Sequence, residues 1–113
     1  MRSLLRSKIH KAVVTEANIN YIGSITIDED LMERVGLWPG EKVAVVSKTS
    51  GERLETYVIK GEKNSGIICM NGAAAHKIKV GEEIIIMGFE LTDDQIKPKI
   101  ILVDENNKYQ KDL

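Results

Sequence analysis

The chain alternates hydrophobic and polar residues in short runs, and this period of two predicts strands rather than long helices. Turn-forming residues, mainly Gly, Pro, Asn and Ser, separate the runs. Six or seven such strands at this spacing are typical of a small barrel or sandwich, and we favour a closed barrel because closure leaves no strand edge exposed. The runs that we interpret as strands are residues 8–15, 19–27, 42–47, 53–60, 67–70, 82–91 and 98–104.

Two segments have helical rather than strand character. Asp28 is suited to cap the N-terminus of a helix, and Gly36 is suited to end it. Between them, Leu31 and Val35 recur at helical spacing. Residues 72–78 are too few for more than one helical turn. We therefore expect a mainly β fold with one or two short helices.

The composition is that of one soluble domain spanning residues 1–113. Hydrophobic residues make up 42% and charged residues 29%, and the net charge of -1 provides no basic field for nucleic acid or an anionic membrane. No apolar run approaches the roughly 20 residues that span a bilayer, and the first residues are too poor in apolar side chains for a signal peptide. Cys69, the single cysteine, fits a reducing cytoplasm. We expect residues 105–113 to form a polar, flexible tail.

The predicted strand at 19–27 is interrupted by Gly23 and Ser24. Glycine inside a strand costs about 0.5–1 kcal/mol relative to alanine, so its presence requires a reason. A β-bulge or bend that helps to close a barrel is the structural explanation. The chemical alternative is that the Ser24 hydroxyl attacks the Gly23 carbonyl, which has no neighbouring side chain to block its approach.

Strand alternation also groups several polar side chains on shared faces. Lys8 and His10 share one face of the first predicted strand. Arg53 and Tyr57 share one face of the fourth, and Thr56 lies on the opposite face. A lysine and an arginine from different strands can bind the two ends of a small dianion, with a phenol donor beside them. The alternative is a solvated surface without any ligand.

Residues 70–78 join a turn to a stretch of almost bare backbone. Asn71-Gly72 is a turn pair, and three alanines follow it. A tight turn that leads into a helix is one interpretation, and the presentation of backbone N–H groups to a ligand is the other. No phosphate-binding fingerprint is present. The two histidines and the cysteine are scattered, so we expect no metal site.

Four short motifs match one known family in order and spacing. They are Lys-Ile-His at 8–10, Tyr-Ile-Gly-Ser at 21–24, Arg-Leu-Glu-Thr-Tyr at 53–57 and Asn-Gly-Ala-Ala-Ala-His at 71–76. No single motif is specific, but the combination resembles the aspartate 1-decarboxylase family from Lys8 to about Phe89. The resemblance implies a double-psi β-barrel and a homotetramer of cleaved protomers.

The resemblance further implies that the chain makes its own cofactor. Ser24 attacks the Gly23 carbonyl, the resulting ester eliminates, and hydrolysis leaves a pyruvoyl group at position 24, with no metal involved. The chain is thereby cut between Gly23 and Ser24. Thr56, Asn71 and Tyr21 match family positions associated with this processing step.

The activity implied by the resemblance is the decarboxylation of L-aspartate to β-alanine and carbon dioxide, for pantothenate and coenzyme A biosynthesis. The pyruvoyl ketone would form a Schiff base with the substrate amine and accept the electrons that decarboxylation releases. Arg53 and Lys8 are expected to bind the substrate carboxylates, and Tyr57 to donate the proton. The remaining residues expected to bind substrate are Gly72, Ala73, Ala74 and His10.

The alternative is a small β-barrel without enzymatic activity, acting as a binding or oligomerisation module in which Gly23-Ser24 is only a bulge. One Phe, one Trp and three Tyr are too few for a platform that stacks nucleic-acid bases. The net charge of -1 also disfavours affinity based on phosphate contacts. Cleavage between Gly23 and Ser24 separates the hypotheses, because only the enzyme requires it.

Overall fold

Short strands dominate the structure, as the alternation of the sequence predicts. The computed structural model describes residues 1–113 and contains one nine-stranded sheet and two short helices. The strands are β1 (Arg2–Val13), β2 (Glu16–Asn18), β3 (Ser24–Asp28), β4 (Lys42–Ser47), β5 (Arg53–Gly61), β6 (Ile68–Asn71), β7 (Glu83–Thr92), β8 (Lys99–Val103) and β9 (Tyr109–Asp112). The helices are α1 (Glu29–Val35) and α2 (Ala74–Lys77).

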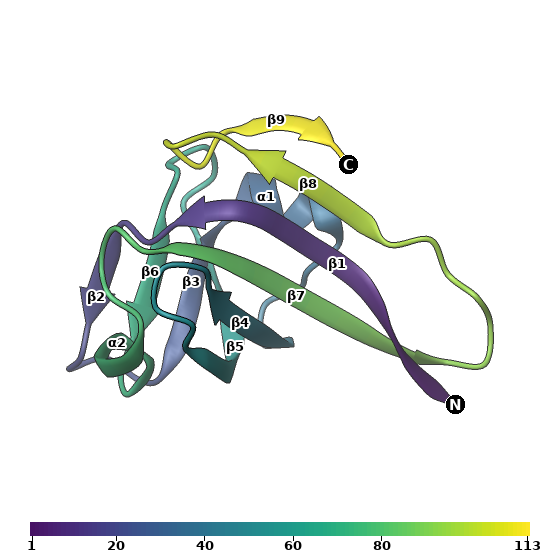
Figure 1. The fold of residues 1–113 in the computed structure, drawn as a ribbon, viewed down its shortest axis with the longest axis horizontal. Coiled ribbons are helices and arrows are strands. Elements are labelled where there is room, and N and C mark those ends of the chain that lie inside the picture. The colour runs from purple at the N-terminus through teal and green to yellow at the C-terminus, as the bar shows by residue number, and fades with distance from the viewer.

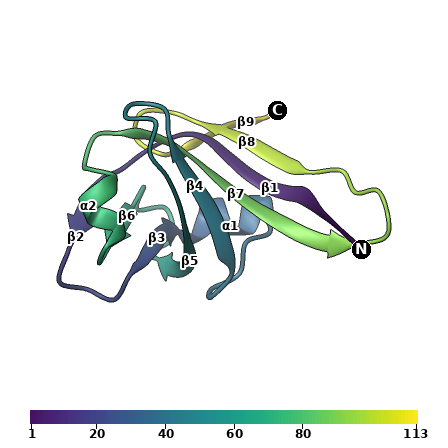
Figure 2. The ribbon, with the colours of Figure 1, turned by 60° about the horizontal axis from the view of Figure 1, so that its bottom comes forward.

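The order of strands in the sheet is β2-β6-β3-β5-β4-β7-β1-β8-β9. Strand β1 is antiparallel to β7 and parallel to β8, whereas β3 is parallel to β5 and antiparallel to β6. Parallel neighbours require crossover connections, and α1 lies in the connection from β3 to β4 and β5. Strands β1 and β7 run side by side along the molecule, and β2, β6 and α2 gather at one end (Figures 1 and 2).

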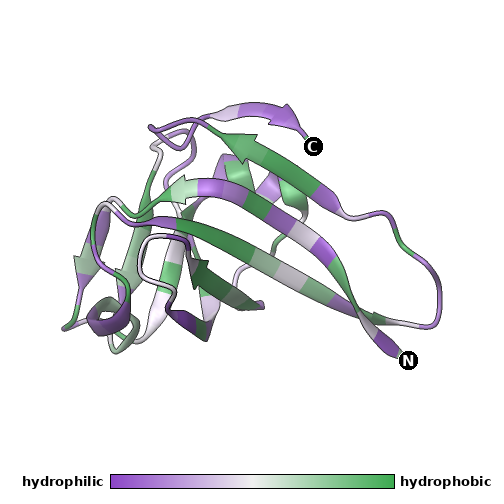
Figure 3. Ribbon diagram, viewed as in Figure 1, coloured by the Kyte–Doolittle hydropathy of each residue, from purple (hydrophilic) through white to green (hydrophobic).

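The core is almost entirely aliphatic, because the chain has one Phe and one Trp and the Trp is exposed. Short hydrophobic stretches are interspersed with polar ones along β1, whereas β8 is hydrophobic over most of its length (Figure 3). Helix α1 packs against β1, β3, β5 and β8 and buries its apolar side on them. The largest fully buried side chains are Ile9, Ile25, Ile27, Leu31, Met32, Ile68, Met70, Ile78, Ile84, Ile86, Ile101 and Val14.

Helix α1 has the ends that the sequence predicts. The Asp28 carboxylate accepts a hydrogen bond from the Asp30 backbone N–H at 2.8 Å, and Gly36 ends the helix with φ +76°. Asp28 also accepts the backbone N–H groups of Asn64 and Gly66, each at 2.8 Å. One buried carboxylate therefore caps the helix and ties the loop before β6 to the end of β3.

The predicted strand at 19–27 is wrong in its first half. Residues 19–23 form a loop, and β3 begins at Ser24, so Gly23 precedes the strand instead of interrupting it. The side chain of Asn18 accepts the Asn20 N–H at 3.1 Å, and its backbone oxygen accepts the Tyr21 N–H at 3.4 Å. These local bonds form a turn in place of a ladder. Ile19, Tyr21 and Ile22 are accordingly at least half exposed.

The C-terminal segment, expected to be a flexible tail, carries the edge strand β9. Val103 and Tyr109 pair across the β8–β9 turn, and the Leu113 N–H donates to the Ile100 oxygen at 2.8 Å. The Tyr109 ring lies 3.9 Å from the guanidinium of Arg34 on α1. The sequence does not predict this strand, because its residues are mostly polar or charged. Backbone pairing and a cation–π contact stabilise it instead.

Candidate active site

A buried polar cluster lies where β3 pairs with β6. Ser24 is fully buried and directly opposite Asn71 in the antiparallel register. The Asn71 amide nitrogen, Nδ2, donates to Ser24 Oγ at 2.9 Å and to Thr26 Oγ1 at 3.0 Å. Ser24 Oγ in turn donates to the Ile22 carbonyl oxygen at 3.0 Å. The Ser24 hydroxyl therefore donates one hydrogen bond and accepts another, which fixes its position.

The backbone of Gly72 packs directly on that of Gly23. Gly72 has φ +63°, and a Cβ atom added there would lie 2.6 Å from both Cα and N of Gly23 and 2.8 Å from the Tyr21 oxygen. Only glycine meets both demands, a left-handed conformation and this close approach. Gly23, in contrast, has no atom within 4 Å of its own added Cβ. The Gly23 backbone is thus packed against Gly72 at its N and Cα atoms, and the space that a side chain of residue 23 would take is open.

A shallow surface groove of ≈ 280 Å³ opens beside Gly23. Thr56 on β5 reaches it, as do the small residues Ala73 and Ala74 at the start of α2. The groove is lined by Gly23, Leu54, Glu55, Thr56, Ala73, Ala74 and Lys77. All five residues that the family resemblance associates with processing, namely Tyr21, Gly23, Ser24, Thr56 and Asn71, therefore lie in one neighbourhood with Gly72–Ala74.

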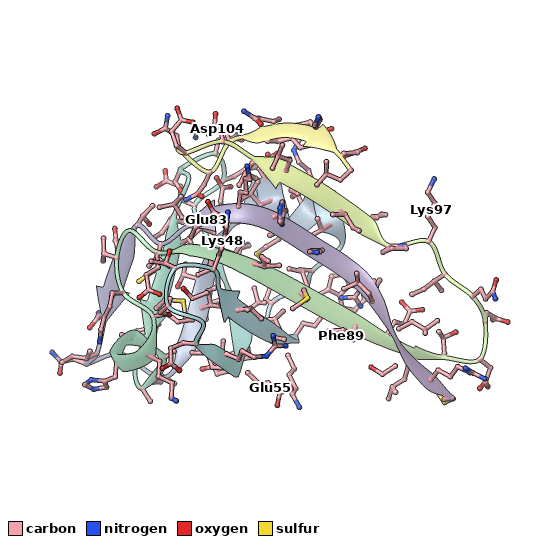
Figure 4. The ribbon with its side chains drawn as sticks, viewed as in Figure 1. Lys48, Glu55, Glu83, Phe89, Lys97 and Asp104 are labelled. Carbon is pink, nitrogen blue, oxygen red and sulfur yellow. The ribbon has the colours of Figure 1, made fainter.

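Arg53 and Tyr57 lie on the outer face of β5, and Thr56 lies on the inward face, as strand alternation predicts. Neither Arg53 nor Tyr57 forms a side-chain hydrogen bond or ion pair within the chain. Between them, Glu55 extends outward from the sheet and pairs with Lys42, with 3.4 Å between Nζ and Oε2 (Figure 4). The guanidinium of Arg53 and the phenol of Tyr57 are consequently free to meet a ligand.

Lys8 and His10 do not join this neighbourhood within one chain. Both lie on β1, which is separated from β3 by β7, β4 and β5 in the sheet. Neither side chain forms a hydrogen bond or ion pair with a residue of the Ser24 cluster. The partly buried side chain of Lys8 has no partner in the chain, and the buried Nδ1 of His10 has none either. Burial, followed by the charges of Lys8 and Lys11, lowers the pKa of His10.

Two members of the buried cluster were not predicted from the sequence. The Cys69 thiol donates to Asn71 Oδ1 at 3.2 Å, and Thr26 accepts from the same amide. The sequence does indicate part of this arrangement, because residues two apart on a strand share a face. Cys69 and Asn71 are two apart on β6, and Ser24 and Thr26 are two apart on β3. Alternation alone does not reveal that these two strands are neighbours.

The structure shows neither a cluster of metal-binding side chains nor a helix that could span a membrane. No group of three or more His, Cys, Asp or Glu side chains is placed to hold a metal ion. Neither helix has the length and apolar character needed to cross a membrane.

Comparisons with known proteins place this geometry in context. A family model described as aspartate decarboxylase matches residues 1–110. Aspartate 1-decarboxylase of Caldicellulosiruptor saccharolyticus is 59% identical, over 96% of this chain and 88% of the relative. A relative of the same name from Neisseria meningitidis serogroup C is 50% identical, over 95% of this chain and 87% of the relative. Another from Bacillus subtilis is 47% identical, over 99% of this chain and 91% of the relative.

The fold is also found in a solved structure. A rationally designed double-psi β-barrel protein superposes with a TM-score of 0.56 at 20% identity, over 76% of this chain and 95% of the designed chain. This likeness concerns the fold alone and confirms the expected double-psi β-barrel, built here with nine strands where six or seven were expected. From the family model and the identities of 47–59% to aspartate 1-decarboxylases, we conclude that the chain belongs to the aspartate decarboxylase family.

Proposed function

We propose that this chain decarboxylates L-aspartate to β-alanine and carbon dioxide, a step toward pantothenate and coenzyme A, in the cytoplasm. Family membership and relatives named aspartate 1-decarboxylase support this reaction. The observation that carries the proposal is the hydrogen bond of 2.9 Å from Asn71 Nδ2 to the buried Ser24 Oγ, directly after the unobstructed Gly23. No feature of the fold favours the binding or oligomerisation module.

The proposed maturation begins at the Gly23–Ser24 peptide bond. Ser24 Oγ attacks the Gly23 carbonyl carbon, the C–N bond breaks, and the hydroxyl proton moves to the released nitrogen, which gives an ester. Elimination removes the Cα proton and breaks the Cβ–Oγ bond of residue 24, so Gly23 leaves as a carboxylate. One water is then consumed and ammonia is lost, which leaves a pyruvoyl group at the start of the chain 24–113.

The residues present fit this chemistry. The Ser24 hydroxyl is held by a donor and an acceptor, and burial excludes competing water from it. The small residues Ala73 and Ala74 leave the groove beside Gly23 open, and Thr56 reaches the same groove. At this position a pyruvoyl carbonyl supplies an electron sink that condenses with an amine, as cofactor carbonyls do in other decarboxylations.

The outer face of β5 provides the groups for substrate. We assign a substrate carboxylate to Arg53, whose planar guanidinium binds carboxylates through two parallel hydrogen bonds. Tyr57, two positions from Glu55 on the same face, is assigned as the proton donor to the α-carbon. Neither side chain has a partner in the chain that would compete with substrate.

The position of β1 supports an active site shared between copies. Lys8 would bind the second substrate carboxylate as a point charge, with His10 next to it on the same face. Because β1 and β3 lie on different parts of the sheet, we assign Lys8 and His10 to the site of a neighbouring protomer. This arrangement agrees with the homotetramer of cleaved protomers that the family resemblance implies.

Intact mass of the purified chain tests the proposed maturation. We expect two fragments, residues 1–23 and 24–113, from the natural sequence and one uncut chain from Ser24→Ala. Ser65→Ala, which removes an exposed hydroxyl far from the cluster, is the matched control and should be cut normally. A Ser24→Ala chain that is still cut between residues 23 and 24 contradicts the proposal.

A further inference from the structure

The amide of Asn71 has two ends, and each has its own partner. Nδ2 faces the hydroxyls of Ser24 and Thr26, and Oδ1 faces the Cys69 thiol at 3.2 Å. The only other acceptor near that thiol is the Met70 carbonyl oxygen, at 3.8 Å. Cys69 and Asn71 are both buried on β6, so water does not compete for these groups.

The two hydroxyls alone do not determine which way the amide points. A hydroxyl can donate or accept, so an Asn71 side chain rotated by half a turn would still find partners in Ser24 and Thr26. In that rotated form the carbonyl Oδ1 would draw the Ser24 proton away from the Ile22 oxygen that now accepts it. A thiol differs from a hydroxyl because its sulfur is only a weak acceptor. The Cys69 S–H therefore favours the orientation with Oδ1 toward sulfur and Nδ2 toward Ser24.

We propose that Cys69 is a positioning residue for self-cleavage: its thiol donates to Asn71 Oδ1 and thereby holds the Asn71 amide nitrogen on Ser24 Oγ. This inference rests on the proposed maturation at Gly23–Ser24. Cys69 acts through Asn71 and touches neither the attacking oxygen nor the peptide bond that breaks. Burial, with a smaller contribution from Glu16, raises the pKa of the thiol, which keeps its proton available at neutral pH.

The first test compares rates of self-cleavage. Each chain is made in a cell-free synthesis reaction, and fragment 24–113 is followed by intact mass over time. Loss of one weak hydrogen bond should slow Cys69→Ala by about 2- to 10-fold. Cys69→Val fills the site without a donor and should be as slow as Cys69→Ala. Ile68→Val, a similar loss of volume at the neighbouring buried position, should be cut at the natural rate.

The outcomes separate this inference from the proposal beneath it. If the natural chain is never cut, the proposed maturation is wrong and this inference is wrong with it. If the natural chain is cut but Cys69→Ala is cut equally fast, only the inference is overturned. A Cys69→Val chain cut at the natural rate likewise overturns it, because filling the site would then matter and donating would not.

A second test does not depend on how well Cys69→Ala folds. The chain has one cysteine, so its S–H stretching band in the infrared comes from Cys69 alone. Asn71→Ala removes the acceptor at 3.2 Å and should move this band to higher frequency, while Ile68→Val should leave it in place. An S–H band that stays unmoved in Asn71→Ala shows that the thiol does not donate to Asn71 and overturns the inference.

Discussion

Replacing Gly72 with alanine should damage stability and maturation together. The new Cβ would lie 2.6 Å from Cα and N of Gly23, well inside van der Waals contact, and against backbone that has no flexible side chain to move. Alanine at φ +63° adds about 1–2 kcal/mol of left-handed strain. Relieving the clash adds about 1–3 kcal/mol. We therefore expect Gly72→Ala to lower the free energy of unfolding by about 2–5 kcal/mol.

A matched control isolates the clash from the strain. Gly51 has φ +81° and no atom within 4 Å of an added Cβ, so Gly51→Ala carries the backbone strain alone. Urea unfolding of both variants in the uncut Ser24→Ala background gives the two free energies without interference from cleavage. We expect Gly72→Ala to be less stable than Gly51→Ala by about 1–3 kcal/mol.

Maturation should distinguish the same pair of variants. Pushing the Gly23 backbone away from Gly72 misplaces the carbonyl that Ser24 attacks, so Gly72→Ala should be cut more slowly than the natural chain. Gly51→Ala should be cut at the natural rate. Equal stability of the two variants, together with normal cleavage of Gly72→Ala, refutes the claim that close packing of these two glycines presents the scissile bond.

Three further predictions follow from the substrate face and from one buried carboxylate. Arg53→Lys keeps the charge but loses the two parallel hydrogen bonds of the guanidinium, so it should chiefly raise KM for aspartate, whereas Tyr57→Phe should lower kcat by about 10²–10⁴-fold. Both chains should still be cut, and equal changes in KM for the two variants contradict these roles. Lys8→Ala and Tyr57→Phe chains should each have strongly reduced activity alone but recover activity when co-assembled, and no recovery contradicts a site shared between protomers. The Ser47 hydroxyl donates to the buried Glu82 carboxylate and lowers its pKa, so the ionised carboxylate stabilises the fold. This stabilisation is present above the unfolded pKa of 4.5 and is lost as the pH falls through the lower folded pKa. In a pH series of melting temperatures, Glu82→Gln should therefore lose less stability in acid than the natural chain does.

The elements with strong local signals are those that the sequence predicts best. Residues 42–47 form β4 with the predicted bounds, because a valine-rich run lies between two turns. Helix α1 is equally well predicted, because Asp28 and Gly36 each act through bonds within a few residues. The loop at 19–23 could not be predicted, because the exposed Ile19 and Tyr21 extend the alternating pattern of the buried Ile25 and Ile27.

Strand alternation predicts which residues of the candidate site share a face of a strand, but not which strands are neighbours. Alternation separates Thr56 from Arg53 and Tyr57, and the structure confirms that division of β5. The contact between Ser24 and Asn71 depends on the pairing of β3 with β6, which no local pattern encodes. The separation of Lys8 from Ser24 depends in the same way on strand order, and it is this separation that points to a neighbouring protomer.

The most direct test of the account is the intact mass of the chain after borohydride reduction in the presence of L-aspartate. The account predicts a fragment of residues 24–113 that carries a covalent adduct derived from the substrate, and a fragment of residues 1–23 without one. Ser24→Ala, treated in the same way, should remain uncut and unmodified. An uncut natural chain, or a cut chain whose larger fragment gains no mass on reduction, contradicts the central claim that Ser24 becomes the group that binds aspartate.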